Sequence, residues 1–231
     1  MNVSLKTRLA AMGAILMLLI PVVGAAAERG FEPGGYDFAL AFRRDKLDID
    51  VGGTRTANSI NTVTLDFLEL ANPWFQPGFR VGYATLDRSG TSIPATLDPA
   101  GAFFGLSFRG RYPGTGAFSA QLRAAYTYYQ VDDNFNLQST NLTWYETRAE
   151  LGVSYSQRFF DAGAGVEFLN LDGRQKVRDN GVFSSTSFDN PARTEPYLEL
   201  GFHPDATGRI AVRLSDGDRR ALTITFSRST D

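Results

Sequence analysis

The segment from Trp144 to Ser156 alternates between two kinds of side chain without interruption, which is the period of a β-strand and not of a helix. One face is apolar and consists of Tyr145, Thr147, Ala149, Leu151, Val153 and Tyr155. The other face is mostly polar and consists of Trp144, Glu146, Arg148, Glu150, Gly152, Ser154 and Ser156. A strand with one apolar and one charged face has to lie between two different media.

The same alternation recurs from about residue 36 to the end of the chain, with no convincing helix in between. The ten expected strands are centred on residues 36–43, 62–67, 79–84, 104–109, 118–128, 144–156, 162–168, 198–202, 209–214 and 221–226. With their flanks, several of them reach the roughly 9 to 11 residues that a tilted membrane strand needs. The last two look short, which leaves an eight-stranded arrangement as an alternative.

The first 27 residues have the features of an export signal. Lys6 and Arg8 precede an uncharged apolar run from Leu9 to Val23, and residues 25–27 are three alanines that offer a cleavage site. The run is shorter than a membrane-spanning helix of about 20 residues, although an uncleaved anchor is the alternative. We therefore expect a signal peptide over residues 1–27, an N-terminal segment over 28–35 and an outer-membrane barrel over 36–231.

Composition excludes several classes of protein. Removing the signal lowers the basic residues from 23 to 21 against 25 acidic residues, so no basic surface for nucleic acid is expected. The chain has no Cys, which excludes both a disulfide framework and a lipid-modified cysteine. No apolar run after residue 27 is long enough for a transmembrane helix, so a membrane location requires a closed barrel.

Connections of two lengths alternate along the chain and assign the two ends of the barrel. The short turns are expected at residues 72–78, 113–116, 157–161 and 203–208, and the longer polar loops at 50–58, 87–101, 132–141 and 172–193. Outer-membrane barrels have short periplasmic turns and longer outer loops, so both chain termini are expected on the periplasmic side. The segment Asp216–Asp218 is the exception, a tight hairpin at the outer end.

Alternation alone does not say which face points outward, because a soluble lipocalin-like barrel places its apolar face inside. Two observations favour an apolar exterior and a transmembrane barrel. The charged face is rich in Gly and Ala, which leave room in a narrow lumen. Aromatic residues also cluster near the strand ends as two girdles would. These are Trp74, Phe75, Tyr112, Phe118, Tyr155, Phe159, Phe160 and Phe202 beside the short turns, and Tyr128, Tyr129, Trp144 and Tyr145 beside the longer loops. The expected fold class is thus all-β, an antiparallel up-and-down transmembrane β-barrel of about ten strands.

Over residues 36–228 the pattern resembles the small outer-membrane β-barrel proteins of Gram-negative bacteria, a group that includes the OmpA membrane domain, OmpX and the ten-stranded omptins. The resemblance is one of pattern and points to no single family. The last strand is similar to their C-terminal assembly signal, which implies contact with the barrel assembly machinery through Leu222, Ile224 and Phe226, although residues 227–231 extend beyond the aromatic. The resemblance also implies the cell outer membrane as the location, with lipid and lipopolysaccharide as partners. We expect a monomer with no cofactor and no metal.

If the apolar faces meet lipid, a set of charged side chains of both signs must face the lumen. They are Arg43, Asp66, Arg80, Arg109, Arg123, Glu146, Arg148, Glu150, Glu167, Glu195, Glu199 and Arg213. Charges in a confined interior have to be paired or hydrated. A ladder of Glu146, Arg148 and Glu150 with neighbouring strands predicts a barrel plugged by ion pairs, with a structural or surface-interaction role. A narrow, porin-like pore with a charged selectivity path is the alternative.

Catalysis is the third class of function, since some barrels of the group that the chain resembles are enzymes with a His and a Ser or carboxylate partner near the outer rim. The one histidine here, His203, begins a short turn expected in the periplasm, and we interpret it as a solvated cap. Residues 132–133 are interpreted as loop-forming aspartates. No catalytic residue is therefore predicted. Adhesion through 172–193 stays open, with Phe183 and Phe188 as exposed contacts.

Overall fold

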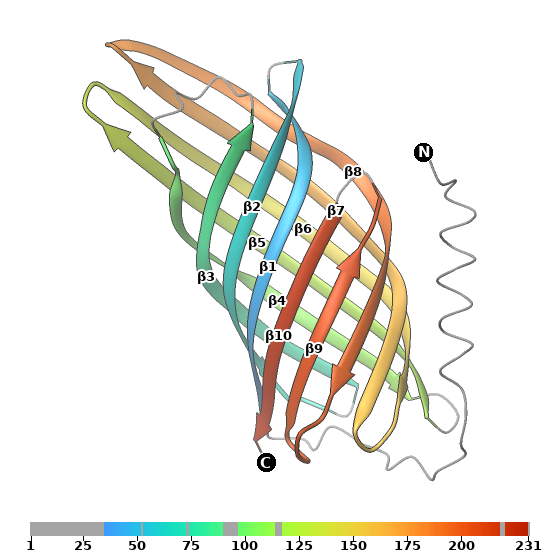
Figure 1. Cartoon of the computed structure of the whole chain (residues 1–231). Coiled ribbons are helices and arrows are strands. Elements are labelled where there is room, and N and C mark those ends of the chain that lie inside the picture. The colour runs from blue at the N-terminus through green and yellow to red at the C-terminus, as the bar shows by residue number, and fades with distance from the viewer. Residues whose placement is uncertain are drawn as a thin grey trace.

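The computed structural model describes residues 35–51, 53–72, 74–89, 97–113, 117–217 and 220–230. Ten antiparallel strands form one closed barrel (Figure 1). They are β1 (Tyr36–Val51), β2 (Thr54–Glu69), β3 (Phe75–Ser89), β4 (Ala100–Pro113), β5 (Phe118–Phe135), β6 (Gln138–Ser156), β7 (Phe160–Asp179), β8 (Val182–Phe202), β9 (Gly208–Ser215) and β10 (Arg220–Thr230). The predicted fold class is confirmed. The predicted signal peptide and nearly all of the N-terminal segment lie outside the described residues.

Each strand pairs with its neighbours in the sequence, and β10 returns to β1 to close the ring. The closing register places Tyr36 opposite Thr230 and Leu40 opposite Phe226. Because the ring is closed, its strands have no free edge and their backbone groups pair within the sheet, as a lipid environment requires. Within the described part of the chain, no helix has the length and hydropathy needed to cross a bilayer.

The apolar faces of the strands point outward. Large side chains that are 38 to 62% exposed surround the middle of the barrel, among them Leu40, Phe42, Leu65, Val81, Phe104, Leu106, Leu122, Leu151, Val153, Leu200 and Leu214. Exposure of so wide an apolar surface to water is unfavourable, whereas contact with the hydrocarbon of a bilayer is favourable. The soluble barrel with an apolar interior is therefore excluded. A closed barrel with ten strands, an apolar exterior and a charged interior is the architecture of an outer-membrane protein.

The strands are much longer at the outer end than the alternation predicts. β5 to β8 contain 18, 19, 20 and 21 residues, and their outer parts project together beyond the rest of the barrel (Figure 1). The predicted loops at 50–58, 132–141 and 172–193 are wrong, because all three are mostly strand. The loop interpretation of residues 132–133 is likewise wrong, since both lie in β5.

Two-residue turns make these long hairpins possible. Phe135 pairs with Gln138, and Asp179 pairs with Val182. Asn180 and Gly181 both have positive φ, 48° and 87°, as a type I′ hairpin turn requires. This turn matches the right-handed twist of the flanking strands, so the ladder continues to the tip.

The last two strands are short, as their sequences suggest, and this changes the closure of the barrel. β9 has 8 residues and β10 has 11. Towards the outer end β1 pairs directly with β8 at Asp50↔Asp189 and Val51↔Phe188. The ring therefore has ten strands lower down and eight where β1 meets β8. An eight-stranded ring has an interior that side chains can fill.

Candidate functional site

The lumen is lined by charge and is the candidate site. All twelve side chains predicted to face inward lie on the inner side of the sheet. Glu146, Glu150, Glu167, Glu195, Glu199, Arg148 and Arg213 are buried. Arg109 and Arg123 are the most accessible of the twelve, with side chains 26% exposed. The strands bring these groups together because every second residue of each strand points into a narrow ring.

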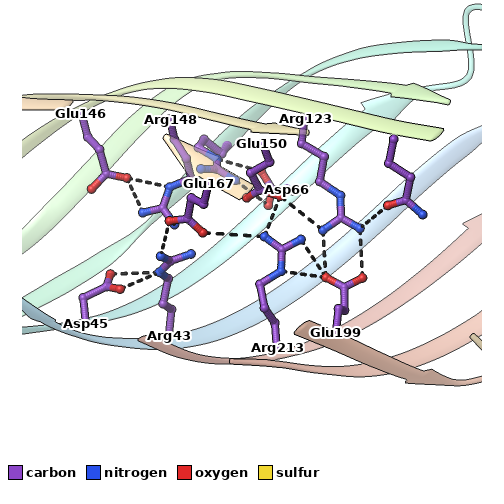
Figure 2. A network of polar contacts seen from close by, with 12 residues as sticks. Arg43, Asp45, Asp66, Arg123, Glu146, Arg148, Glu150, Glu167, Glu199 and Arg213 are labelled. Atoms are coloured by element: carbon purple, nitrogen blue, oxygen red, sulfur yellow. Dashed lines mark hydrogen bonds and ion pairs between the residues drawn. The ribbon is translucent and has the colours of Figure 1, made fainter. Parts of the chain in front are cut away.

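Glu167 on β7 is the first centre of the network shown in Figure 2. One of its oxygens accepts from Arg43 Nη2 at 2.7 Å and from Arg148 Nη1 at 3.2 Å. Its other oxygen lies 3.8 Å from Arg213 Nη1. The arginines come from β1, β6 and β9, so this one carboxylate connects strands on opposite sides of the barrel. Arg43 is held in turn by Asp45, two residues along β1, at 2.8 Å.

Glu199 on β8 is the second centre. Both its oxygens accept from Arg123 at 3.0 Å, and one of them also accepts from Arg213 at 2.8 Å. Arg209 Nη2 donates to the other oxygen at 2.7 Å. Since Arg213 contacts both Glu199 and Glu167, the two centres form one continuous network across the lumen.

The network continues to the periplasmic end through a residue that the sequence analysis did not select. Asp161 at the start of β7 accepts from Arg209 at 2.5 and 2.9 Å. His203 Nε2 lies 2.7 Å from the same carboxylate. The interpretation of His203 as a solvated cap is therefore wrong, because its side chain is only 11% exposed and bonded to Asp161.

Two further pairs lie beside this network. Arg80 on β3 donates to both oxygens of Asp66 on β2, at 2.9 and 3.1 Å. Arg109 on β4 pairs with Asp37 on β1. Asp37 and Asp45 continue the inward alternation of β1, so periodicity is a signal that identifies them.

The charged residues of β6 connect this strand to β5, β7 and β9. Arg148 donates to Glu146 at 2.5 and 3.1 Å and to Glu167, but Glu150 instead pairs with Arg213 at 2.6 Å and lies 3.6 Å from Arg123. Arg148 and Glu150 therefore both pair with other strands, as the expected ladder requires. The guanidinium reaches one neighbour on its strand and one carboxylate on β7.

Above this network, towards the outer end, an apolar cluster fills the lumen. It consists of Ile60, Ala84, Leu86, Leu97, Phe103, Tyr129, Val131, Leu142, Trp144, Leu171, Val177 and Phe188. Tyr129 and Trp144 stack face to face, with ring centroids 4.5 Å apart. The prediction that these two residues belong to an outer aromatic girdle is wrong, because both point inward. The prediction that Phe188 is an exposed contact is also wrong, whereas Phe183 is 74% exposed.

Glycines on the inner face let the aromatic rings pack closely. A Cβ on Gly173 would lie 2.6 Å from the Phe188 ring and from Trp144 Cβ. A Cβ on Gly82 would collide with the ring of Phe103. Both positions therefore require glycine if the cluster is to close the lumen at this density.

A cavity of about 140 Å³ remains beside the ion pairs. Its wall combines arginines of the network with small side chains of the neighbouring strands, including Ala39, Ala41, Thr62, Thr64, Ala211, Thr223 and Thr225. The space is large enough for several water molecules and polar enough to hold them. Among the described residues, no three His, Asp or Glu side chains are arranged to hold a metal ion.

Comparison with known proteins identifies no family model that matches the chain and no curated protein similar in sequence. Several solved structures share the barrel architecture. The outer membrane protein AlkL in lipid bilayers is 14% identical, with a TM-score of 0.49, over 92% of this chain and 97% of that chain. The outer membrane protease OmpT from Escherichia coli is 10% identical, with a TM-score of 0.47, over 84% and 94%. Ail, the attachment invasion locus protein of Yersinia pestis, is 12% identical, with a TM-score of 0.39, over 86% and 100%. At these values none of them carries a ligand or an activity over to this chain.

Proposed function

We propose that the protein is a closed outer-membrane barrel that conducts no solutes and acts through its outer surface. The mature chain spans the membrane with the apolar band, while the projecting ends of β5 to β8 stand above it. The role is structural or one of surface interaction.

The observation that carries this proposal is the double closure of the lumen. The network around Glu167 and Glu199 joins opposite walls, and the apolar cluster around Trp144 fills the ring above it. A solute that passed would have to separate buried ion pairs and then displace packed aromatic rings. Each of these steps costs several kcal/mol when partners are left unpaired or cavities are opened.

Cysteine labelling tests the closure, because the natural chain has no Cys. Thr64 lines the lumen cavity, and Ser185 is exposed on the outer part of β8. We expect an impermeant, negatively charged thiol reagent added to the outer side to label Ser185→Cys rapidly and to leave Thr64→Cys unlabelled. Unfolding in detergent has to expose both thiols equally. Fast labelling of Thr64→Cys in the folded barrel would contradict the proposal.

A narrow pore is the second candidate, and the cavity beside the ion pairs is the observation in its favour. Its polar wall provides the lower half of such a path, and the apolar cluster then acts as the gate. This pore would be favoured if the thiol reagent labelled Thr64→Cys in the folded barrel and if small ions blocked that labelling.

We propose no catalytic role for the histidine. Asp161 binds both His203 and Arg209, which fits an electrostatic link between the turn and the barrel wall. For assembly, we propose that β10 presents Leu222, Ile224 and Phe226 to the barrel assembly machinery, since these alternate residues share the outward face and Leu222 and Phe226 are more than 40% exposed.

A further inference from the structure

Three cations line the outward face of β7 above the apolar band. Arg174, Lys176 and Arg178 are all exposed and occupy alternate positions, so they share one face of the strand. The same face carries Val166 and Phe168 lower down, where it meets lipid. At about 3.3 Å per residue the three side chains form a row about 13 Å long. We refer to Arg174, Lys176 and Arg178 as the basic stripe.

The stripe is flanked by hydrogen-bonding side chains and has no acidic partner. Its neighbours across the sheet are Thr143, Asn141 and Ser139 on β6 and Ser187 and Ser185 on β8. In the described part of the chain no carboxylate forms an ion pair with these three cations, and Arg178 lies over the ring of Phe183, 5.1 Å from its centroid. The nearest acids on this face are Asp172, one alternate position lower, Asp189, which lies opposite Asp172 on β8, and Asp132, two strands away.

The sheet is hollowed next to the upper half of the stripe. A pocket of about 460 Å³ is lined by Lys176 and Arg178 together with Asn141, Ser185 and Phe183, and by Asp132 and Asp133 on another side. Exposed cations with hydroxyl and amide neighbours match the geometry of a phosphate group, which accepts several hydrogen bonds and carries negative charge.

We propose that the basic stripe binds the phosphate groups of lipopolysaccharide in the surrounding outer leaflet. The position of the stripe supports this assignment as well as its charge. The stripe continues the lipid-facing side of β7 above the apolar band and does not face the lumen, so the groups beside it are those that extend outward from the headgroups of neighbouring lipids. In the outer leaflet of an outer membrane these headgroups are phosphorylated sugars. This inference rests on the membrane placement in the proposed function, but not on a closed lumen.

The test compares two variants that each remove two exposed cations. Arg174→Gln/Lys176→Gln changes the stripe, and Arg158→Gln/Arg228→Gln changes cations near the periplasmic end. Each protein is folded into nanodiscs of zwitterionic phospholipid, and compact migration of the unboiled sample confirms the barrel. Binding of purified lipopolysaccharide, of the same material after removal of its phosphates, and of heparin fragments is then measured.

A Lys or Arg near a charged lipid surface contributes about 1 kcal/mol, which is roughly fivefold in affinity. We therefore expect the stripe variant to bind lipopolysaccharide about 25-fold more weakly than the unmodified protein, and the control variant to bind it unchanged. Removing the phosphates has to weaken binding by the unmodified protein to a similar extent. Equal loss in both variants, or indifference to the phosphates, would overturn the proposal. Loss of heparin binding alone would assign the stripe to a soluble sulfated polysaccharide instead.

Discussion

Arg148 offers a quantitative test of the lumen network. Its guanidinium is the one cation in the described residues that pairs with Glu146, whereas Glu167 also has Arg43 at 2.7 Å and Arg213 at 3.8 Å. Arg148→Met keeps most of the side-chain volume but leaves the buried carboxylate of Glu146 without a cation. Breaking a buried pair in this way costs about 3 to 5 kcal/mol of unfolding free energy.

A second change separates the stranded charge from the lost packing. Glu146→Gln removes the charge, so the double variant with Arg148→Met has to cost only about 1 to 3 kcal/mol, the usual penalty for imperfectly bonded buried polar groups. The exposed pair Arg44 and Asp87, 4.0 Å apart, is the matched control, and Arg44→Met is expected to cost less than about 1 kcal/mol.

Equilibrium urea unfolding in lipid vesicles, followed by tryptophan fluorescence, measures these differences. Trp144 lies in the apolar cluster above the network and reports the loss of the closed lumen. The reasoning is refuted if Arg148→Met costs no more than Arg44→Met. It is equally refuted if adding Glu146→Gln to Arg148→Met restores none of the lost free energy of unfolding.

Three other perturbations have defined outcomes. Leu151→Arg places a charge on the lipid face and is expected to cost about 2 to 4 kcal/mol in urea unfolding, whereas Thr147→Arg, nearer the outer rim, is tolerated better, and equal costs would argue against a bilayer there. Gly181→Ala forces an L-residue into the φ of 87° at the β7–β8 tip and is expected to speed proteolysis at that hairpin without lowering the unfolding midpoint of the barrel. The backbone N–H of Gly208 donates to Asp205 and lowers the pKa of that carboxyl, so its stabilisation is present above the ordinary aspartate pKa and is lost as the pH falls through the folded value. Asp205→Asn, which keeps the acceptor, has to remove this pH dependence from hydrogen exchange at the turn.

The faces of the strands were predictable because the membrane imposes them. Where one side of a strand meets hydrocarbon and the other a charged lumen, every slip in alternation is costly, so segments such as 144–156 and 36–43 carry a clear period of two. The same alternation selected the twelve inward charges without knowledge of their contacts.

The outer extension was not predictable from alternation because its outward face is polar or charged and its inward face mixes polar with apolar residues, so no regular contrast between the two faces appears in the sequence. In the segment 174–178, three cations alternate with the inward Gln175 and Val177. A segment of this polarity is typical of a loop. The Asn180–Gly181 pair is a turn signal that identifies the hairpin, since both residues tolerate positive φ.

The ion-pair partners of the charged residues in the lumen could not be predicted from the sequence either. Arg148 and Glu150 are two apart on one strand, but the carboxylate that Arg148 reaches besides Glu146 is on β7, and Glu150 turns to Arg213 on β9. Such contacts depend on the tilt and stagger of the whole barrel, which the local pattern does not contain. The inward stacking of Tyr129 on Trp144 was missed because the expected strands ended at residues 128 and 144, whereas β5 continues to Phe135 and β6 begins at Gln138.

Planar-bilayer recording of the purified, unmodified barrel tests the central claim most directly, with Trp144→Ala/Phe188→Ala as the variant that empties the apolar cluster. If ion pairs and packed rings close the lumen, the unmodified protein inserts without steady conductance. The variant, which still has its ion-pair network, then shows at most brief openings. Steady, ion-selective conductance of the unmodified barrel would contradict the account and assign the lumen to transport.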